Sequence, residues 1–336
     1  MNLTPIVLYN NTSSASPAPF QQMLIIPANT SINSTYTNIR FRDENYKLLT
    51  SWLESHTTSS ATIWVVLPTG ISSKSAMTIY METGNLSDNF LDGVTVGEAP
   101  QLSGTYGQYD NGAKVFGFYE NFAGTTLSSK WSVVGSGGSV NNGLSISMAS
   151  GSTGDYVIYS TSTFSPPVIA ETLFSTTAFA TNLRTYNPTL SASNTQPNPA
   201  ADGASSSVSD WSINGAASGS WNAQQGNNPA FFQSATGNNS AASNWLLGVG
   251  YTGSTNYWYG FNGATQTNYY TYTSSSTDSP TGALYFGLGA NWGSISTTTT
   301  ESYVWVRVRA YPPNGTIPIQ VNKTSSIINI AEGLVI

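Results

Sequence analysis

Few side chains in this sequence are of a type that could do chemistry. Its 336 residues include no cysteine and a single histidine, His56, in the stretch 55–60 that we expect to be a loop. Disulfides, thiolate metal sites and cysteine nucleophiles are therefore excluded. The sequence around His56 supplies no partners for a Ser/His/Asp triad or a histidine-based zinc site, so we expect a solvated histidine.

The acidic residues show no spacing that is typical of catalysis. Retaining glycosidases need two carboxyl groups about 5 Å apart, usually delivered by alternating acidic residues on one strand. No Glu-x-Asp-x-Glu pattern occurs, and the acids after residue 109 lie far apart in sequence: Asp110, Glu120, Asp155, Glu171, Asp202, Asp210, Asp278 and Glu301. We predict that the protein is not an enzyme and holds no cofactor. Structural calcium bound through Asp, Asn and backbone oxygens is kept as an alternative, although no EF-hand spacing occurs.

Aromatic residues are concentrated where basic residues are missing, because no Lys or Arg occurs between Arg184 and Arg307. Aromatic rings with a polar edge suit sugar stacking or a protein interface. Half of any alternating strand faces a core, so packing inside the protein is the other interpretation, and the simpler one. The predicted glycan or partner surface comprises Trp245, Tyr257, Trp258, Tyr259, Tyr269, Tyr270 and Tyr272.

The composition points to a folded protein from outside the cell. Charged residues make up 8% of the chain, against roughly 25% in ordinary soluble proteins, and 152 of 336 residues are Ser, Thr, Asn or Gly. With 39% hydrophobic residues and a net charge of −6, the chain should fold, and ten scattered basic residues exclude a nucleic-acid footprint. A surface of hydroxyls and amides responds little to pH, so an acidic external environment is one hypothesis.

Nine Asn-x-Ser/Thr sequons are candidate N-glycosylation sites, although chance predicts nearly as many at this composition. They begin at Asn2, Asn10, Asn11, Asn29, Asn33, Asn85, Asn238, Asn314 and Asn322. The N-terminus lacks a basic region and a long apolar stretch, and no segment approaches the ~20 apolar residues of a membrane span. We expect either a leader outside this numbering or an exit route other than secretion, such as a virion.

The elements that must position these residues are strands. Alternating patterns predict strands over residues 5–9, 21–26, 39–41, 62–67, 77–81 and 303–311, and hairpins around Asn142-Gly143 and Asn262-Gly263. In the strand 303–311 we expect the aliphatic face, with Val304, Val306 and Val308, to be buried. Turn-forming residues over 92–112 predict a domain boundary.

Several segments resemble known families. The segments 39–44 (IRFRDE), 49–54 (LTSWLE), 61–68 (ATIWVVLP) and 78–81 (TIYM) with Gly84-Asn85 resemble DUF2341, a small β domain of unknown function. The segments 116–122 (FGFYENF), 127–131 (LSSKW) and 305–311 (WVRVRAY) resemble a concanavalin A-like, laminin-G-like lectin sandwich. This pairing occurs in archaeal surface proteins and archaeal viruses, so the resemblance implies an extracellular or virion location and a role in adhesion, glycan contact or surface assembly.

The C-terminal tail contains short β-prone pieces after the last strong strand. A loose apolar strand needs a partner, which could be a neighbouring subunit's sheet or the chain's own small domain. The candidate assembly strand comprises Ile327, Ile328, Ile330, Leu334, Val335 and Ile336.

The predicted fold is therefore all-β, with a small β-sandwich followed by a larger concanavalin A-like (jelly-roll) sandwich. The predicted domains are a DUF2341-like domain (1–95), a linker (96–112), the lectin-like sandwich (113–313) and the tail (314–336). We expect a non-enzymatic structural and adhesive protein, a virion spike, turret or fibre component of an archaeal virus. Its partners would be copies of itself, other surface or capsid proteins and host glycans. The alternatives are a host filament or cell-surface subunit joined by strand donation, and a secreted carbohydrate-active enzyme.

Overall fold

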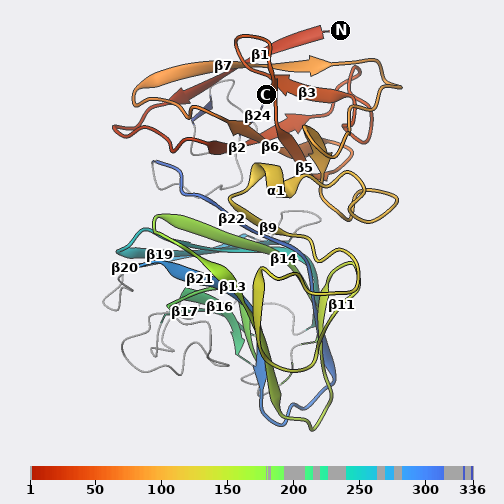
Figure 1. Ribbon diagram of the computed structural model, residues 1–336, viewed down its shortest axis with the longest axis vertical. Coiled ribbons are helices and arrows are strands. Elements are labelled where there is room, and N and C mark those ends of the chain that lie inside the picture. The colour runs from red at the N-terminus through yellow and green to blue at the C-terminus, as the bar shows by residue number, and fades with distance from the viewer. Residues whose placement is uncertain are drawn as a thin grey trace. The chain divides into compact units, whose positions relative to one another are not determined.

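The computed structural model describes residues 2–178, 180, 183–192, 209–214, 220–225, 240–262, 269–275, 282–313, 328–329 and 334–335. The chain forms two compact units (Figure 1). Unit 1 comprises Met1–Tyr119 with Arg309–Ile336, and unit 2 comprises Glu120–Val308. The described part of the chain has no helix with the length and apolar character that crossing a membrane requires.

Unit 1 is built from short strands and one turn of helix. Its elements are β1 (Asn2–Asn10), β2 (Phe20–Pro27), β3 (Ile39–Arg42), β4 (Leu48–Leu49), β5 (Ser51–His56), β6 (Ser60–Leu67), β7 (Ser75–Thr83), β8 (Val96–Glu98), α1 (Gly112–Val115), β9 (Phe118–Glu120, which ends in unit 2), β23 (Ile328–Asn329) and β24 (Leu334–Val335). They form two five-stranded sheets in the orders β23-β1-β7-β3-β4 and β24-β2-β6-β5-β8. The strands predicted over residues 5–81 are confirmed as β1, β2, β3, β6 and β7.

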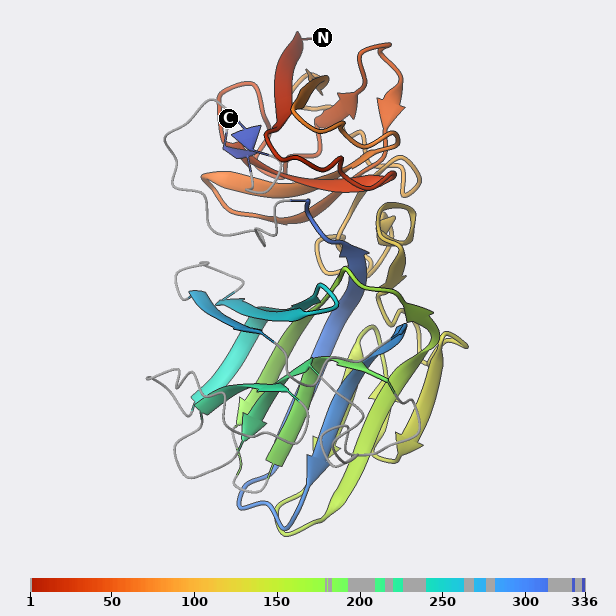
Figure 2. The same cartoon turned by 90° about the vertical axis from the view of Figure 1, so that its left-hand side faces the viewer.

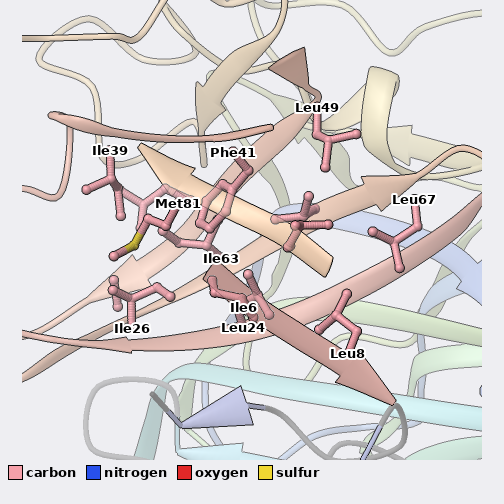
Figure 3. Packing of buried hydrophobic residues seen from close by; sticks show 14 of the residues in the cluster. Ile6, Leu8, Leu24, Ile26, Ile39, Phe41, Leu49, Ile63, Leu67 and Met81 are labelled. Carbon is pink, nitrogen blue, oxygen red and sulfur yellow. The ribbon is translucent and has the colours of Figure 1, made fainter. Parts of the chain in front are cut away.

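The core of unit 1 lies between these two sheets. In β1 the buried Ile6 and Leu8 alternate with the exposed Val7 and Tyr9, as expected for a strand with one face inward. Figure 3 shows the meeting of side chains from both sheets, listed here by strand: Ile6 and Leu8 (β1), Ile39 and Phe41 (β3), Leu49 (β4) and Met81 (β7) from one, and Leu24, Ile26 (β2), Ile63 and Leu67 (β6) from the other. Their burial is the main source of stability for this unit.

The residues of the predicted linker, 96–112, contribute structure to unit 1. β8 pairs in parallel with β5, with Leu53 opposite Glu98. Asp110 accepts hydrogen bonds from Trp52 Nε1, from the backbone N–H of Gly112 and from the Tyr119 hydroxyl, all at 2.9 Å. The first three residues of this segment therefore belong to a sheet, and Asp110 holds its other end by hydrogen bonds.

Unit 2 consists of two larger sheets (Figure 2). Its strands are β10 (Trp131–Gly135), β11 (Gly138–Val140), β12 (Leu144–Met148), β13 (Gly154–Phe164), β14 (Val168–Ala178), β15 (Leu183–Ser191), β16 (Ser209–Asn214), β17 (Ser220–Gln225), β18 (Ser240–Tyr251), β19 (Thr255–Asn262), β20 (Tyr269–Ser275), β21 (Leu284–Trp292) and β22 (Thr299–Ala310, which ends in unit 1). One sheet has the order β10-β13-β21-β15-β16-β17. The eight-stranded sheet has the path β11-β12-β22-β14-β18-β19-β20, and its eighth strand, β9, pairs with β22 off this path. The prediction of an all-β fold, a small sandwich followed by a larger jelly-roll sandwich, is confirmed.

The two predicted hairpins are present. β11 and β12 pair around Asn142-Gly143, and both of these residues have positive φ, although the loop has three residues because Val140 lies opposite Leu144. β19 pairs with β20, with Phe261 opposite Tyr269.

The predicted inward face of the last strand, β22, is only partly correct. Val306 and Val308 are buried as predicted, but Val304 is partly exposed, and Tyr303, Trp305 and Arg307 are buried as well. Local alternation assigned the aliphatic residues to the core, but the buried polar residues of β22 have partners on distant strands: Tyr303 bonds Asn187 of β15, and Arg307 bonds Glu171 of β14.

Candidate functional site

The predicted aromatic surface lies on β18, β19 and β20, at one edge of the eight-stranded sheet. Trp258 is fully buried and lies opposite Val249, which is also buried, so Trp258 is a core residue. Tyr259 is 1% exposed, whereas Trp245 and Tyr257 are partly exposed. The remaining three have backbones in β20 and side chains outside the described residues: Tyr269, Tyr270 and Tyr272.

Tyr259 is held by a carboxylate two strands away. The register places Tyr259 opposite Gly248 of β18, and Gly248 opposite Glu171 of β14. The Tyr259 hydroxyl donates a hydrogen bond to Glu171 Oε1, and Arg307 Nε donates one to Glu171 Oε2 at 2.5 Å. A Cβ on Gly248 would lie 2.1 Å from Cζ of Tyr259, so a glycine is needed where the ring crosses β18.

The Glu171–Arg307 pair is suited to holding strands together. Both side chains are at most 1% exposed, and the guanidinium carbon of Arg307 lies 4.7 Å from the centroid of the Trp305 ring. Removing one member would leave an uncompensated charge in a buried place, which is strongly destabilising. Because fixed donors contact both carboxylate oxygens, the arrangement is better suited to structure than to proton transfer.

Two other carboxylates of unit 2 have different sets of partners. Glu120 accepts hydrogen bonds from the Ser128 hydroxyl at 2.5 Å and from the Phe122 N–H at 3.1 Å, and lies 3.6 Å from Lys130 Nζ. Glu301 contacts the Tyr303 hydroxyl at 2.8 Å, and burial raises the pKa of Glu301 to about 8.

In unit 1, the prediction that His56 lies in a loop is wrong. His56 is the last residue of β5 and lies opposite Ala61 of β6. The pairing resumes after an irregularity between Leu53 and Ser55, which local sequence does not reveal. The ring centroids of His56 and Tyr36 are 6.0 Å apart.

Glu98 and Glu82 are buried carboxylates of unit 1 with opposite titration behaviour. Burial raises the pKa of Glu98, although the Ser103 hydroxyl donates a hydrogen bond to it at 2.6 Å. Burial also opposes ionisation of Glu82, but hydrogen bonds from Arg40 and Arg42 outweigh it and lower the pKa. Glu82 is therefore the anion of a three-residue charge cluster on β3 and β7.

Metal ligands are not gathered in the described part of the chain, where no group of three or more His, Asp or Glu side chains lies close enough to hold an ion. The expectation of no cofactor therefore stays a prediction, with structural calcium as its alternative.

The sequons differ in accessibility. Asn10 is fully buried, and its amide nitrogen donates hydrogen bonds to the backbone oxygens of Ser14 and Ile71. Asn33 is partly exposed. Four are exposed, namely Asn2, Asn11, Asn29 and Asn85, and three lie outside the described residues, namely Asn238, Asn314 and Asn322.

Parts of the predicted assembly strand pair within unit 1. β23 runs parallel to β1, with Ile328 opposite Leu8, and β24 runs parallel to β2, with Leu334 opposite Leu24. The label β24 in Figure 1 marks this strand. The other residues of the predicted strand lie outside the described residues: Ile327, Ile330 and Ile336.

Sequence reasoning missed the buried charge clusters. Arg40 and Arg42 alternate on a predicted strand, and this spacing is a signal that one face of β3 carries two cations. Nothing local marks Glu171 and Arg307, which are 136 positions apart.

Comparison with known proteins identifies one family and one viral relative. Residues 35–99 match the family described as "Domain of unknown function (DUF2341)", which confirms the predicted resemblance for that segment. The chain is 37% identical over 131 residues to "Uncharacterized protein 562" of Sulfolobus islandicus rod-shaped virus 1. The match covers 36% of this chain and 23% of that protein, so the chain spans less than a quarter of its relative.

The solved structures to which this chain is similar include a pseudo-glucanase and a glucanase. A pseudo β-1,3-glucanase and immunostimulatory antigen of Mycobacterium tuberculosis is 14% identical, with a TM-score of 0.43, covering 58% of this chain and 98% of that chain. An endo-β-1,3-glucanase from Pyrococcus furiosus is 10% identical, with a TM-score of 0.43, covering 58% of this chain and 94% of that chain.

Proposed function

We propose that this protein is a non-enzymatic structural and adhesive component of a virion surface, namely a spike, turret or fibre of an archaeal virus that contacts host glycans or proteins. The observation that carries the proposal is the 37% identity over 131 residues to a protein of Sulfolobus islandicus rod-shaped virus 1. The composition supports it, because neutral hydroxyls and amides replace charged groups over most of the polar positions.

The contact surface in this proposal is the β18–β19–β20 edge. Trp245 and Tyr257 are the partly exposed aromatic residues there whose side chains the structure describes. Aromatic rings with polar edges provide apolar area and hydrogen bonding at low entropic cost. Glu120 and Glu171 accept hydrogen bonds from side chains held in place by the fold, and this supports the non-enzymatic part of the proposal.

Immunogold electron microscopy tests the location. Antibodies against this chain would be applied to purified virus particles and to the cell-surface fraction of the same culture. Labelling of particle ends, vertices or fibres is expected. Labelling confined to host filaments or envelopes would overturn the virion location, and release of sugars from β-glucans by the purified protein would overturn the non-enzymatic part.

A host filament or cell-surface subunit joined by strand donation is the second candidate. The observation that favours it is the parallel pairing of β23 with β1 and of β24 with β2. Both tail strands occupy sheet edges, which are sites where a strand of another chain can add. Labelling of a repeating host fibre would support this candidate.

A further inference from the structure

A carboxyl group lies buried between the two sheets of unit 2. Glu301 belongs to β22 of the eight-stranded sheet and is fully buried. Its Oε2 lies 2.8 Å from the Tyr303 hydroxyl oxygen, and the same hydroxyl bonds Oδ1 of Asn187 on β15 of the six-stranded sheet. The three side chains therefore form a polar connection across the sandwich.

The number of hydrogens in this connection indicates the protonation state of Glu301. A tyrosine hydroxyl has one hydrogen and can donate it to one acceptor. If Tyr303 donates to Asn187 Oδ1, its contact with Glu301 is a hydrogen bond only when the carboxyl group supplies the proton. Rotating the Asn187 amide would free the hydroxyl hydrogen, but the buried carboxylate would then be stabilised by one hydrogen bond, because Glu301 Oε1 has no partner within the described residues.

Among the described residues, no cation pairs with Glu301, and burial outweighs the hydrogen bonds of the neutral Tyr303 and Asn187 side chains, which favour the charged form. Across the β12–β22 pair, Ile146 lies opposite Glu301 and Leu144 opposite Tyr303, and both apolar residues are fully buried. Tyr303 is the titratable group that faces Glu301, and its ring lies 5.5 Å from that of Phe174 on β14.

We propose that Glu301 is a protonated carboxylic acid in the native protein and that it joins the two sheets through Tyr303 and Asn187, so that its own contribution to the stability of unit 2 is largest in acid. The geometry and burial carry this assignment. Burial also raises the pKa of Glu301 to about 8 and raises that of Tyr303 well above its ordinary value.

The direction of the pH effect follows from the proton count of the two states. Between about pH 4.5 and pH 8, native Glu301 keeps a proton that the unfolded chain releases, so stability falls as the pH rises through this window. Across this window the unfolding constant of unit 2 should therefore rise, by at most about tenfold for each pH unit.

Methionine oxidation in urea measures this effect for each unit separately. Met148 is the methionine of unit 2, buried on β12 opposite Thr299 of β22, and Met81 is buried in unit 1. Peroxide labelling of the full chain across a urea series at pH 4.5 and pH 8 gives one transition for each residue. The Met148 transition of the wild-type chain is expected at lower urea at pH 8, whereas that of Glu301→Gln should shift much less and lie above the wild type at pH 8.

Glu82→Gln is the matched control, because Glu82 is also a fully buried glutamate but has a lowered pKa. It should move the Met81 transition to lower urea at pH 8, and the difference from the wild type should shrink as the pH falls.

Infrared spectra of wild-type protein with carbon-13 glutamate provide a test that does not depend on a folded variant. A carboxylic-acid carbonyl band that persists at pH 6 and is lost only as the pH rises through 8 is expected for Glu301, and Glu98, whose pKa is also raised, is the other described glutamate that could add to it. Absence of that band at pH 6, or parallel pH dependence of the wild type and Glu301→Gln, would overturn the proposal.

Discussion

Gly248 is the residue on which the contact between Tyr259 and Glu171 depends. Replacing it by alanine would place a Cβ 2.1 Å from Cζ of Tyr259, and the ring would have to leave its position across β18. Overpacking of this kind typically costs about 1–3 kcal/mol. We expect Gly248→Ala to shift the Met148 oxidation transition to lower urea and leave that of Met81 unchanged.

Gly260→Ala is the control for this prediction. A Cβ there would first meet Cδ2 of Leu247 at 3.0 Å, which is the end of a flexible side chain. Its effect should be clearly smaller. An equal effect of the two substitutions would mean that the Tyr259–Glu171 contact is not what Gly248 protects.

Trp245 and Tyr257 give the binding proposal a test at the same scale. If the β18–β19–β20 edge contacts host glycans or proteins, Trp245→Ala and Tyr257→Ala should each weaken binding to host envelopes by about 1–3 kcal/mol, the range of interface hot spots. Val133→Ala is a suitable control, because Val133 is 49% exposed on β10 of the other sheet. Binding by both aromatic variants at the wild-type level would remove this edge as the contact surface.

At the scale of elements, the segment 96–119 depends on Asp110. Its carboxylate accepts three hydrogen bonds, two of them from the side chains of Trp52 and Tyr119. Asp110→Ala would leave these donors without their acceptor, so we expect unit 1 to lose about 2–4 kcal/mol, measured by the Met81 transition. Asp43→Ala is the comparison, since Asp43 accepts from the N–H groups of Asn45 and Lys47 on the surface and should cost less. Equal losses would show that the contacts of Asp110 do not anchor the segment.

The strands themselves could be predicted from the sequence because alternation is local. β1, β2, β3, β6 and β7 lie where short apolar or alternating runs are bounded by turn-forming residues. The strand at residues 96–98 could not be read this way, because Gly97 looks like a loop residue until β8 pairs with β5. Turn-forming residues indicate where the chain changes direction, but they do not indicate which distant strand the segment will pair with.

The buried face of β22 was beyond local reasoning for a similar cause. An alternating strand with valines on one side predicts an aliphatic inner face. Arg307 is buried because Glu171, 136 positions away, neutralises it. The candidate site shares this limit, since the aromatic strands were recognised from composition, whereas the burial of Trp258 depends on its register with Val249.

For the whole molecule, both the surface composition and the proposed acid form of Glu301 suit an acidic environment. A chain with 8% charged residues has few exposed carboxylates whose protonation would alter its net charge. In the interior of unit 2, the proposed acid form of Glu301 would be favoured by low pH. Glu82 acts in the opposite direction, because its stabilising ion pairs with Arg40 and Arg42 are present above its unfolded pKa and are lost as the pH falls through its lowered native pKa. The Arg40–Glu82–Arg42 cluster should therefore limit the stability of unit 1 in acid.

The C-terminal tail relates the fold to assembly, and truncation after Pro318 separates its two roles. β23 and β24 pair with the outer edges of β1 and β2, and removing them would leave the backbone groups of those edges unpaired. If the tail serves its own chain, the truncated protein should show a Met81 transition at lower urea that is independent of protein concentration. If tails are exchanged between copies, the full-length protein should form oligomers that the truncated protein does not form, and a peptide of residues 319–336 should bind the truncated protein. Native assembly and an unchanged Met81 transition after truncation would exclude both roles, because neither sheet edge would then depend on the tail.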